Sequence, residues 1–163
     1  MKKFIYISIL LVCTSCEIQY SMLDGSIDAD TFSVEIFEEQ AANAPAGYGI
    51  EFTEFLRDYI VSRSKLKLTK SNADIEISGK IVKYFTSPVS IQSDDQAATN
   101  RLTIVLEVSV INNKDEKQSF ENNFDGFSDY ESSLDLSAVE DDLLDQINEI
   151  LAQNIVNQLS SNW

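Results

Sequence analysis

The sequence predicts an α+β fold, a two-layer sandwich in which two helices pack on one face of a mainly antiparallel sheet of four to five strands. Several segments alternate apolar and polar side chains, which is the pattern of strands with one buried face. Two other segments repeat apolar residues at helical spacing. The segments follow one another as strand, helix, several strands and helix, an order typical of two-layer α+β domains.

The first strand and the first helix come early in the chain. Residues 31–36 alternate apolar and polar side chains, so we expect a strand there. A loop containing Pro45 and Gly47 is predicted over 38–49. Residues 50–64 form the first predicted helix. Its apolar face consists of Phe52, Phe55, Leu56, Tyr59 and Ile60.

The central segments predict a run of strands. Residues 65–69 and 75–81 alternate in the same way, and Gly79 suggests a bulge in the second of these strands. The clearest alternation covers 102–110. The polar stretch 112–115 then predicts a hairpin turn into a further strand that contains Phe120 and Phe124.

The last predicted element is a helix that runs to about Leu159. Ser137 and Glu140 have the spacing of a capping box, and acids at 140–142 favour a helix N-terminus. The sequence therefore predicts that this helix begins at Ser137. Its expected buried face consists of Val139, Leu143, Ile147, Ile150, Leu151, Ile155 and Leu159.

The start of the chain is typical of a bacterial lipoprotein. Two lysines precede an uncharged run of nine residues, which is too short to span a bilayer. Ser15 before Cys16 favours cleavage between them and lipidation of the Cys16 thiol, with residues 1–15 as the signal peptide. The alternative is an ordinary signal peptide with an incidental cysteine.

The remainder predicts a lipidated tether over 16–30 and one α+β domain over 31–163. Cys13 would leave with the signal and Cys16 would be acylated, so we expect neither a disulfide nor a cysteine metal site. The tether begins with Glu17 alone rather than with a cluster of acids. We therefore expect the anchor in the periplasmic leaflet of its membrane.

The chain is strongly acidic, with a formal charge of −15 that becomes −17 once the two lysines of the signal are removed. Such a charge argues against nucleic acid as a partner. The distribution is uneven, because 57–83 is net basic whereas 121–163 contains acids and no lysine or arginine.

The sequence contains no histidine, which is the commonest general base. This absence excludes the Ser/His and Cys/His nucleophile systems and most zinc sites. Neighbouring acids, Glu140 with Asp141 and Asp94 with Asp95, are better explained by a helix cap and a solvated loop. No calcium-binding loop and no glycine-rich phosphate loop is present in the sequence. We expect a protein that is not an enzyme and has no cofactor or metal.

Three lysines suggest a ligand surface. Lys65 and Lys67 project to one side of their strand, and Lys80 belongs to the outward set of the strand over 75–81. If those two strands pair, the lysines form a small cationic patch that can meet an anionic group. The alternative is a solvated face with ion pairs to Asp74 or Glu76.

The lipoprotein signal and the order of several segments resemble the lipopolysaccharide-assembly lipoprotein family LptE, and look closest to its divergent branch. The resemblance covers nearly the whole mature chain. Its segments are 52–60 leading into 66–69, 87–91, 100–104, 137–147, and the terminal Asn162 and Trp163.

This resemblance implies an outer-membrane lipoprotein that plugs the β-barrel LptD, helps to assemble it and helps to deliver lipopolysaccharide to the cell surface. It also implies lipopolysaccharide contact through exposed basic residues, for which Arg101 is the position that the family pattern suggests. The alternative is a free-standing envelope lipoprotein that binds a small ligand or another envelope protein. That alternative predicts an apolar pocket between sheet and helices.

Overall fold

The computed structural model describes residues 28–89 and 99–161. The predicted signal peptide, Cys16 and most of the predicted tether lie outside the described residues. The described elements are β1 (Thr31–Val34), β2 (Glu38–Glu39), α2 (Tyr48–Arg63), β3 (Lys67–Leu68), β4 (Ile75–Val89), β5 (Thr99–Asn112), the 3-10 helix η1 (Glu116–Gln118), β6 (Phe120–Glu131) and α3 (Leu136–Ser161).

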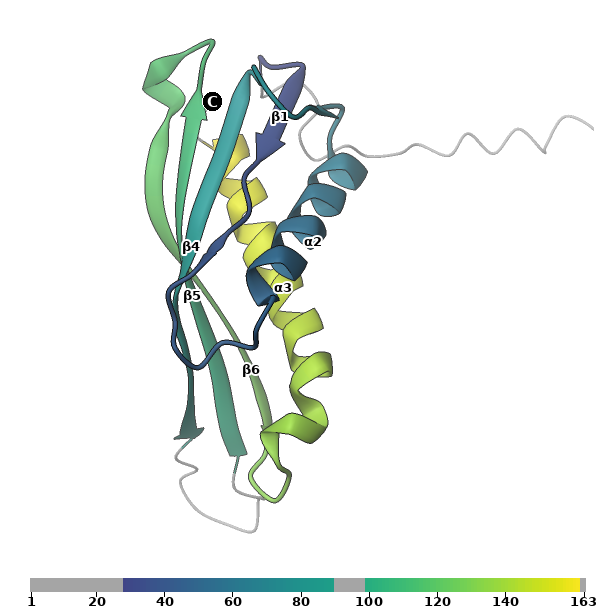
Figure 1. Ribbon diagram of the computed structural model, residues 1–163, viewed down its shortest axis with the longest axis vertical. Coiled ribbons are helices and arrows are strands. Elements are labelled where there is room, and N and C mark those ends of the chain that lie inside the picture. The colour runs from purple at the N-terminus through teal and green to yellow at the C-terminus, as the bar shows by residue number, and fades with distance from the viewer. Residues whose placement is uncertain (1–27, 90–98, 162–163) are drawn as a thin grey trace, which may run out of the picture.

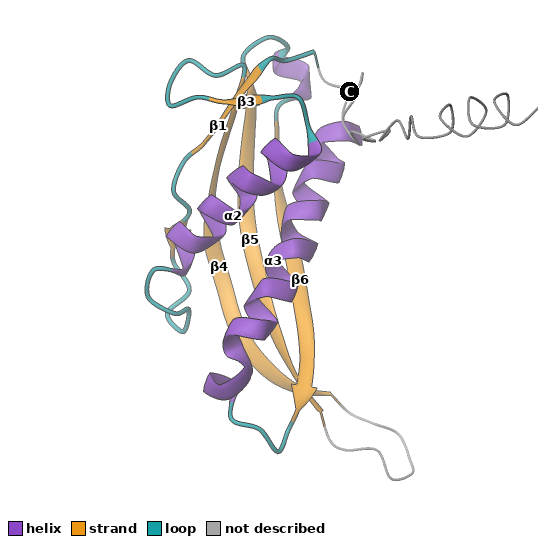
Figure 2. Cartoon of the chain, turned by 90° about the vertical axis from the view of Figure 1, so that its right-hand side faces the viewer, coloured by secondary structure: helices purple, strands orange, loops and turns teal. Residues whose placement is uncertain are grey.

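The molecule has two layers, with α2 and α3 on one face of a single long sheet (Figures 1 and 2). The strand order is β3-β1-β4-β5-β6, and β2 pairs with β4 beyond the end of β1. This arrangement confirms the predicted α+β sandwich with both helices on one side.

The sheet is mixed and has six strands, where the sequence predicted a mainly antiparallel sheet of four to five. β4, β5 and β6 form an antiparallel meander, but β1 is parallel to both β3 and β4, and β2 is parallel to β4. The parallel pairs arise because α2 carries the chain back to its starting end between β1 and β3, so β3 runs in the direction of β1. Alternation within a segment indicates that one face of the strand is buried, but it does not indicate which strand pairs with it or in which direction.

β4 and β5 form a hairpin that runs the length of the molecule, with pairs from Ile75–Asn112 to Val89–Thr99. The register shifts between Ile81 and Lys83, so the irregularity lies at Val82 and the predicted bulge at Gly79 is wrong. Gly79 has another role, because a Cβ there would lie 2.3 Å from Cε1 of the buried Phe37 ring.

The predicted turn after β5 is confirmed. Asn112 ends the strand, and its Oδ1 accepts hydrogen bonds from the backbone N–H groups of Lys114 at 2.8 Å and Asp115 at 3.0 Å. An asparagine side chain that bonds its own following backbone is a common means of reversing the chain.

The core fills the space between the layers. The predicted stripe of α2 is confirmed, with Phe52, Leu56 and Ile60 fully buried and Phe55 and Tyr59 packed at the margin. Opposite them lie the inward residues of the meander. These include Ile75, Ile77, Ile81, Leu102, Ile104, Leu106 and Val108.

Two predictions for the last helix are wrong. α3 begins at Leu136, so Ser137 lies inside the helix and is not its cap. The Glu140 carboxylate instead accepts a hydrogen bond from the hydroxyl of Tyr84. Ile150 is 39% exposed. α3 packs against both α2 and β6, and this packing buries the residue pairs before and after Ile150, namely Ile147 with Asn148 and Leu151 with Ala152. The buried residues are Leu143, Leu144, Ile147, Asn148, Leu151, Ala152, Ile155, Val156 and Leu159.

Candidate functional site

The three lysines of the predicted patch do not lie on neighbouring strands. Lys67 pairs with Thr31 of β1, and β1 separates β3 from β4. Lys80 lies opposite Glu107 of β5, with Lys80 Nζ 3.3 Å from Glu107 Oε1. The predicted pairing of the two lysine strands is therefore wrong, because a strand from much earlier in the chain inserts between them.

Arg101 lies on the sheet face that points away from the helices, which we call the outer face. It forms a bidentate pair with Asp129 of β6, with Nε–Oδ1 at 2.7 Å and Nη2–Oδ2 at 2.9 Å. The guanidinium also lies over the ring of Phe127, with Cζ 3.7 Å from the ring centroid. A cation over an aromatic face and two parallel hydrogen bonds fix the plane of the group.

This pairing stabilises the charged form of both partners. The hydrogen bond from Arg101 lowers the pKa of the Asp129 carboxyl, and the same bond raises the pKa of Arg101. Two of the five N–H donors of a guanidinium are thus used by Asp129. An anion that binds Arg101 would meet the remaining donors and the neighbouring carboxylate.

Phe85 and Phe127 lie on either side of Thr103 in one cross-strand row of the outer face. They are 42% and 43% exposed. The next row toward the β6–α3 turn contains Ser87, Arg101 and Asp129. The sequence prediction missed both aromatic residues, because it ended one strand at 81 and traced the other only through Phe124. Continuing the alternation from Phe124 would have placed Phe127 on the outer face. The same continuation from Ile81 would have placed Phe85 on the buried face, because the irregularity at Val82 reverses the faces of the residues that follow it.

A shallow groove of about 330 Å³ lies further along the outer face. We call it the acidic groove, because glutamates from three strands and from the segment after β1 surround Lys80. The acids are Glu35, Glu38, Glu107 and Glu121. One of them, Glu107, is the ion-pair partner of Lys80, so the others give the groove its negative charge.

A second groove, of about 580 Å³, lies beside β1 where the short β3 ends. Arg57 and Lys70 face Glu35 and Glu76 there, so charges of both signs line it. The Arg57 guanidinium donates to the carbonyl oxygen of Val34. This arginine thereby covers part of the edge of β1 that β3 is too short to pair.

The interior between sheet and helices is filled by side chains. Tyr48 of α2 is 1% exposed, and its hydroxyl donates to Oδ1 of the buried Asn148 of α3 at 2.7 Å. Burial raises the pKa of this tyrosine well above its usual value. The apolar pocket that a small-ligand protein would need between the layers is occupied by these core residues.

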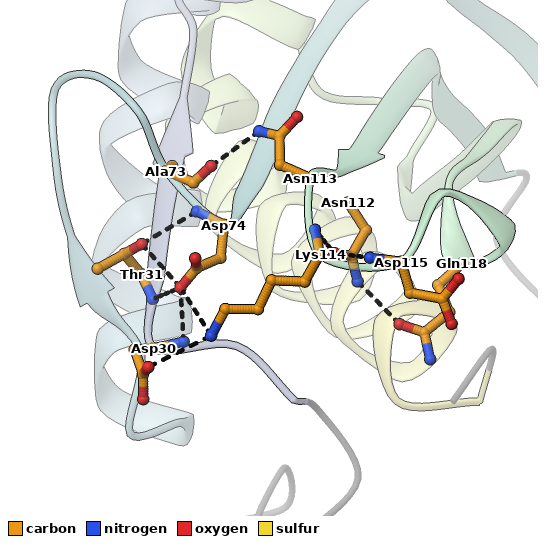
Figure 3. A network of polar contacts seen from close by, with 9 residues as sticks. All are labelled: Asp30, Thr31, Ala73, Asp74, Asn112, Asn113, Lys114, Asp115 and Gln118. Atoms are coloured by element: carbon orange, nitrogen blue, oxygen red, sulfur yellow. Dashed lines mark hydrogen bonds and ion pairs between the residues drawn. The ribbon is translucent and has the colours of Figure 1, made fainter.

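A polar network, shown in Figure 3, holds the start of β1. Asp74 Oδ2 accepts from the backbone N–H groups of Asp30 at 2.8 Å and Thr31 at 3.0 Å. Lys114 Nζ lies 3.3 Å from Asp30 Oδ2 and 3.5 Å from Asp74 Oδ2. We call these four residues the N-terminal latch, because they join β1 to the turns before β4 and after β5.

The described part of the chain offers no metal centre and no membrane-spanning helix. Within 28–89 and 99–161, no group of three or more His, Cys, Asp or Glu side chains is placed to hold a metal ion. Among the helices of that same part, none is long and apolar enough to cross a bilayer.

Comparison with protein families gives one match. The model of the family LptE, described as lipopolysaccharide-assembly, matches residues 29–159, which extend from just before β1 almost to the end of α3. No curated protein matches the chain by sequence.

Several solved structures share the fold. The hypothetical protein CT253 from Chlamydia trachomatis has a TM-score of 0.56 and 12% identity, covering 82% of this chain and 97% of that chain. A minor lipoprotein from Acinetobacter baumannii has a TM-score of 0.54 and 15% identity, covering 83% and 96%. A putative neuraminyllactose-binding hemagglutinin homolog from Helicobacter pylori has a TM-score of 0.53 and 10% identity, covering 82% and 84%. At these identities the likeness is one of fold alone.

Proposed function

Because the chain belongs to the LptE family of lipopolysaccharide-assembly proteins, we propose that it is the plug and assembly factor of an LptD-like outer-membrane β-barrel and assists lipopolysaccharide delivery to the cell surface. The observation that carries this proposal is the extent of the family match. Residues 29–159 include all the described strands and nearly all of α3, so the whole domain and not one motif resembles the family.

The filled interior supports a role in protein assembly. A plug needs a solid body with polar surfaces, since the lumen of a large outer-membrane barrel is polar. The core residues between the layers are almost completely buried, and the grooves described above lie at the surface and are lined largely by charged and polar side chains. The free-standing small-ligand protein that the sequence left as an alternative gains no support from this interior.

Direct contact with lipopolysaccharide is a second part of the proposal. The residues proposed for it are Arg101, Lys65, Lys67 and Lys80. Lys80 is the weakest of these, because it is paired with Glu107 inside the negatively charged acidic groove. Arg101 is the strongest of these, because its guanidinium is exposed at the sheet surface and held in one plane. A phosphate would bind its unused donors against the charge of Asp129, so this contact is expected to weaken at high salt.

The anchor is the third part of the proposal. Acylation of Cys16 would hold the chain to the periplasmic leaflet of the outer membrane, since two or three acyl chains give stable attachment. This membrane contact would bring the domain to a barrel partner in the same membrane.

Depletion of the protein tests the function. We expect surface lipopolysaccharide and assembled barrel to fall together, and mild detergent extraction of the wild-type outer membrane to yield this chain with a barrel in a stoichiometric complex. Normal levels of both, or a chain extracted without a barrel, would contradict the proposal.

Complementation of the depleted cells tests the anchor separately. The Cys13→Ser variant is expected to restore both readouts, since Cys13 leaves with the signal. Cys16→Ser is expected to fail and to leave the chain outside the membrane fraction. Equal behaviour of the two variants would show that Cys16 is not the lipidated residue.

A further inference from the structure

The outer face of the β4–β5–β6 meander is uncovered by any described element. Both α2 and α3 lie on the other side of the sheet (Figure 2). Phe85 and Phe127 nevertheless stand on the uncovered face, separated by Thr103 and thus about 10 Å apart across the strands. Paired exposed aromatics on a sheet that is otherwise sorted into buried and polar faces are typical of a contact surface.

Phe127 is already ordered in the isolated chain. Arg101 stacks on its ring, and Asp129 fixes the guanidinium from the neighbouring strand. A side chain that is held before binding loses little rotational freedom when a partner covers it. This corner of the outer face therefore has the properties of an anchor for binding.

The net negative charge of the outer face lies away from the rows that flank the aromatics. Asp125 shares its row with Lys83, and Asp129 is paired with Arg101, whereas Glu131 lies beyond Asp129 and the acidic groove with Glu121 follows further along the same face. A second copy of this chain would present the same charges, and the two copies would repel each other. Charge complementarity favours a protein surface that carries lysine or arginine around an apolar centre.

We propose that the outer face is the docking surface for a partner protein, with apolar partner residues against Phe85 and Phe127 and basic partner residues at the acidic groove. The identity of that partner as the barrel rests on the proposed function. The inference adds which surface of the domain makes the specific contacts with it, namely the outer face of the sheet.

Site-specific photo-cross-linking in cells tests this orientation on the full chain. A benzoylphenylalanine is placed at position 85 or 127, and matched controls carry it at Ile50 or Val61, which are exposed apolar positions of α2. The barrel is expected to cross-link from 85 and 127 and much less from 50 and 61. Cross-links that are equal at all four positions, or stronger from α2, would overturn the inference while leaving the proposed function intact.

Charge reversal gives a second readout that does not depend on the aromatic positions. The double variant Glu121→Lys/Asp125→Lys is expected to lower recovery of the complex on the order of tenfold at low salt. The control Asp142→Lys/Glu149→Lys makes the same charge change on the exposed side of α3 and is expected to retain recovery. A stronger loss in the control would overturn the inference, whereas absence of any barrel complex from the wild type would instead overturn the proposed function.

Discussion

Phe37 is held between two glycines that leave it no spare room. A Cβ at Gly49 would lie 2.2 Å from the Phe37 carbonyl oxygen, and one at Gly79 would lie 2.3 Å from its ring. The ring packs edge-on against Phe52 with centroids 5.0 Å apart, and the backbone N–H of Phe37 donates to Thr53 Oγ1 at 3.0 Å. This one residue therefore joins the segment after β1 to both α2 and β4.

Gly79→Ala is expected to destabilise the protein by about 1–3 kcal/mol, because the added methyl group must displace a buried ring in a packed core. Urea unfolding followed by circular dichroism measures the change. The neighbouring variant Ser78→Ala points to the outer face and is expected to have little effect. Similar unfolding midpoints for Gly79→Ala and the wild type would mean that the Phe37 ring can move without cost.

Residues such as Phe37 mark the limit of sequence-based prediction. The alternation at 31–36 predicted β1, but nothing in it indicated that the next residue would be buried against a glycine on a strand forty residues later. Likewise, Ile150 fits a helical stripe, and only the simultaneous packing of α3 on α2 and β6 decides that Leu144 and not Ile150 is buried. Local spacing determines the class of an element, and tertiary contacts determine its exact buried side.

At the scale of elements, periodicity identified both helices and the three long strands, and the turn residues predicted the hairpin of β5 and β6, but neither indicated how the short strands pair. β1 and β3 make few backbone pairs, and their position follows from the N-terminal latch and from α2. The cationic patch was predicted from a pairing of β3 with β4 that the insertion of β1 prevents. The candidate residue Arg101 could be chosen from the sequence, but its contacts with Phe127 and Asp129 required the register of β5 and β6.

The N-terminal latch gives a pH-dependent contribution to stability. The backbone N–H of Asp30 and, more weakly, Thr31 and Lys114 stabilise the charged form of Asp74, so the pKa of Asp74 is lowered in the folded protein. A lowered carboxyl pKa adds stability that is present above the unfolded value of about 3.9 and is lost as the pH falls through the folded value.

Asp74→Asn is therefore expected to be less stable than the wild type at pH 7 and to approach it in stability as the pH falls below the unfolded carboxyl pKa of about 3.9. Urea unfolding at pH 7 and below that pKa measures this convergence. Asp58→Asn, on the exposed side of α2, removes one charge without touching the latch and is the matched control. A stability difference between Asp74→Asn and the wild type that does not change with pH would contradict the assignment.

For the whole molecule, the large net negative charge is the dominant electrostatic feature. The chain has a formal charge of −15, and the described ion pairs such as Arg101–Asp129 are exposed. Exposed pairs contribute little to stability, whereas the summed repulsion of the carboxylates opposes the compact state.

The melting temperature is accordingly expected to rise by a few degrees when NaCl increases from about 10 to 150 mM, since the screening length falls from about 30 to 8 Å. The same titration near pH 4, where carboxylates are partly protonated, is expected to give a smaller rise. A melting temperature that falls with salt at pH 7 would mean that the ion pairs outweigh the repulsion.

The long hairpin of β4 and β5 also determines how far the domain extends. The start of β1 and the last turn of α3 lie at the same end of the elongated molecule, and the β6–α3 turn lies at the other (Figure 1). The 15 residues of β4 span about 50 Å at roughly 3.3 Å per residue, which exceeds the hydrocarbon thickness of a bilayer of about 30 Å. Lengthening β4 and β5 by two residues each would move the Val89–Thr99 end of their hairpin outward by about 7 Å while every side chain kept its face.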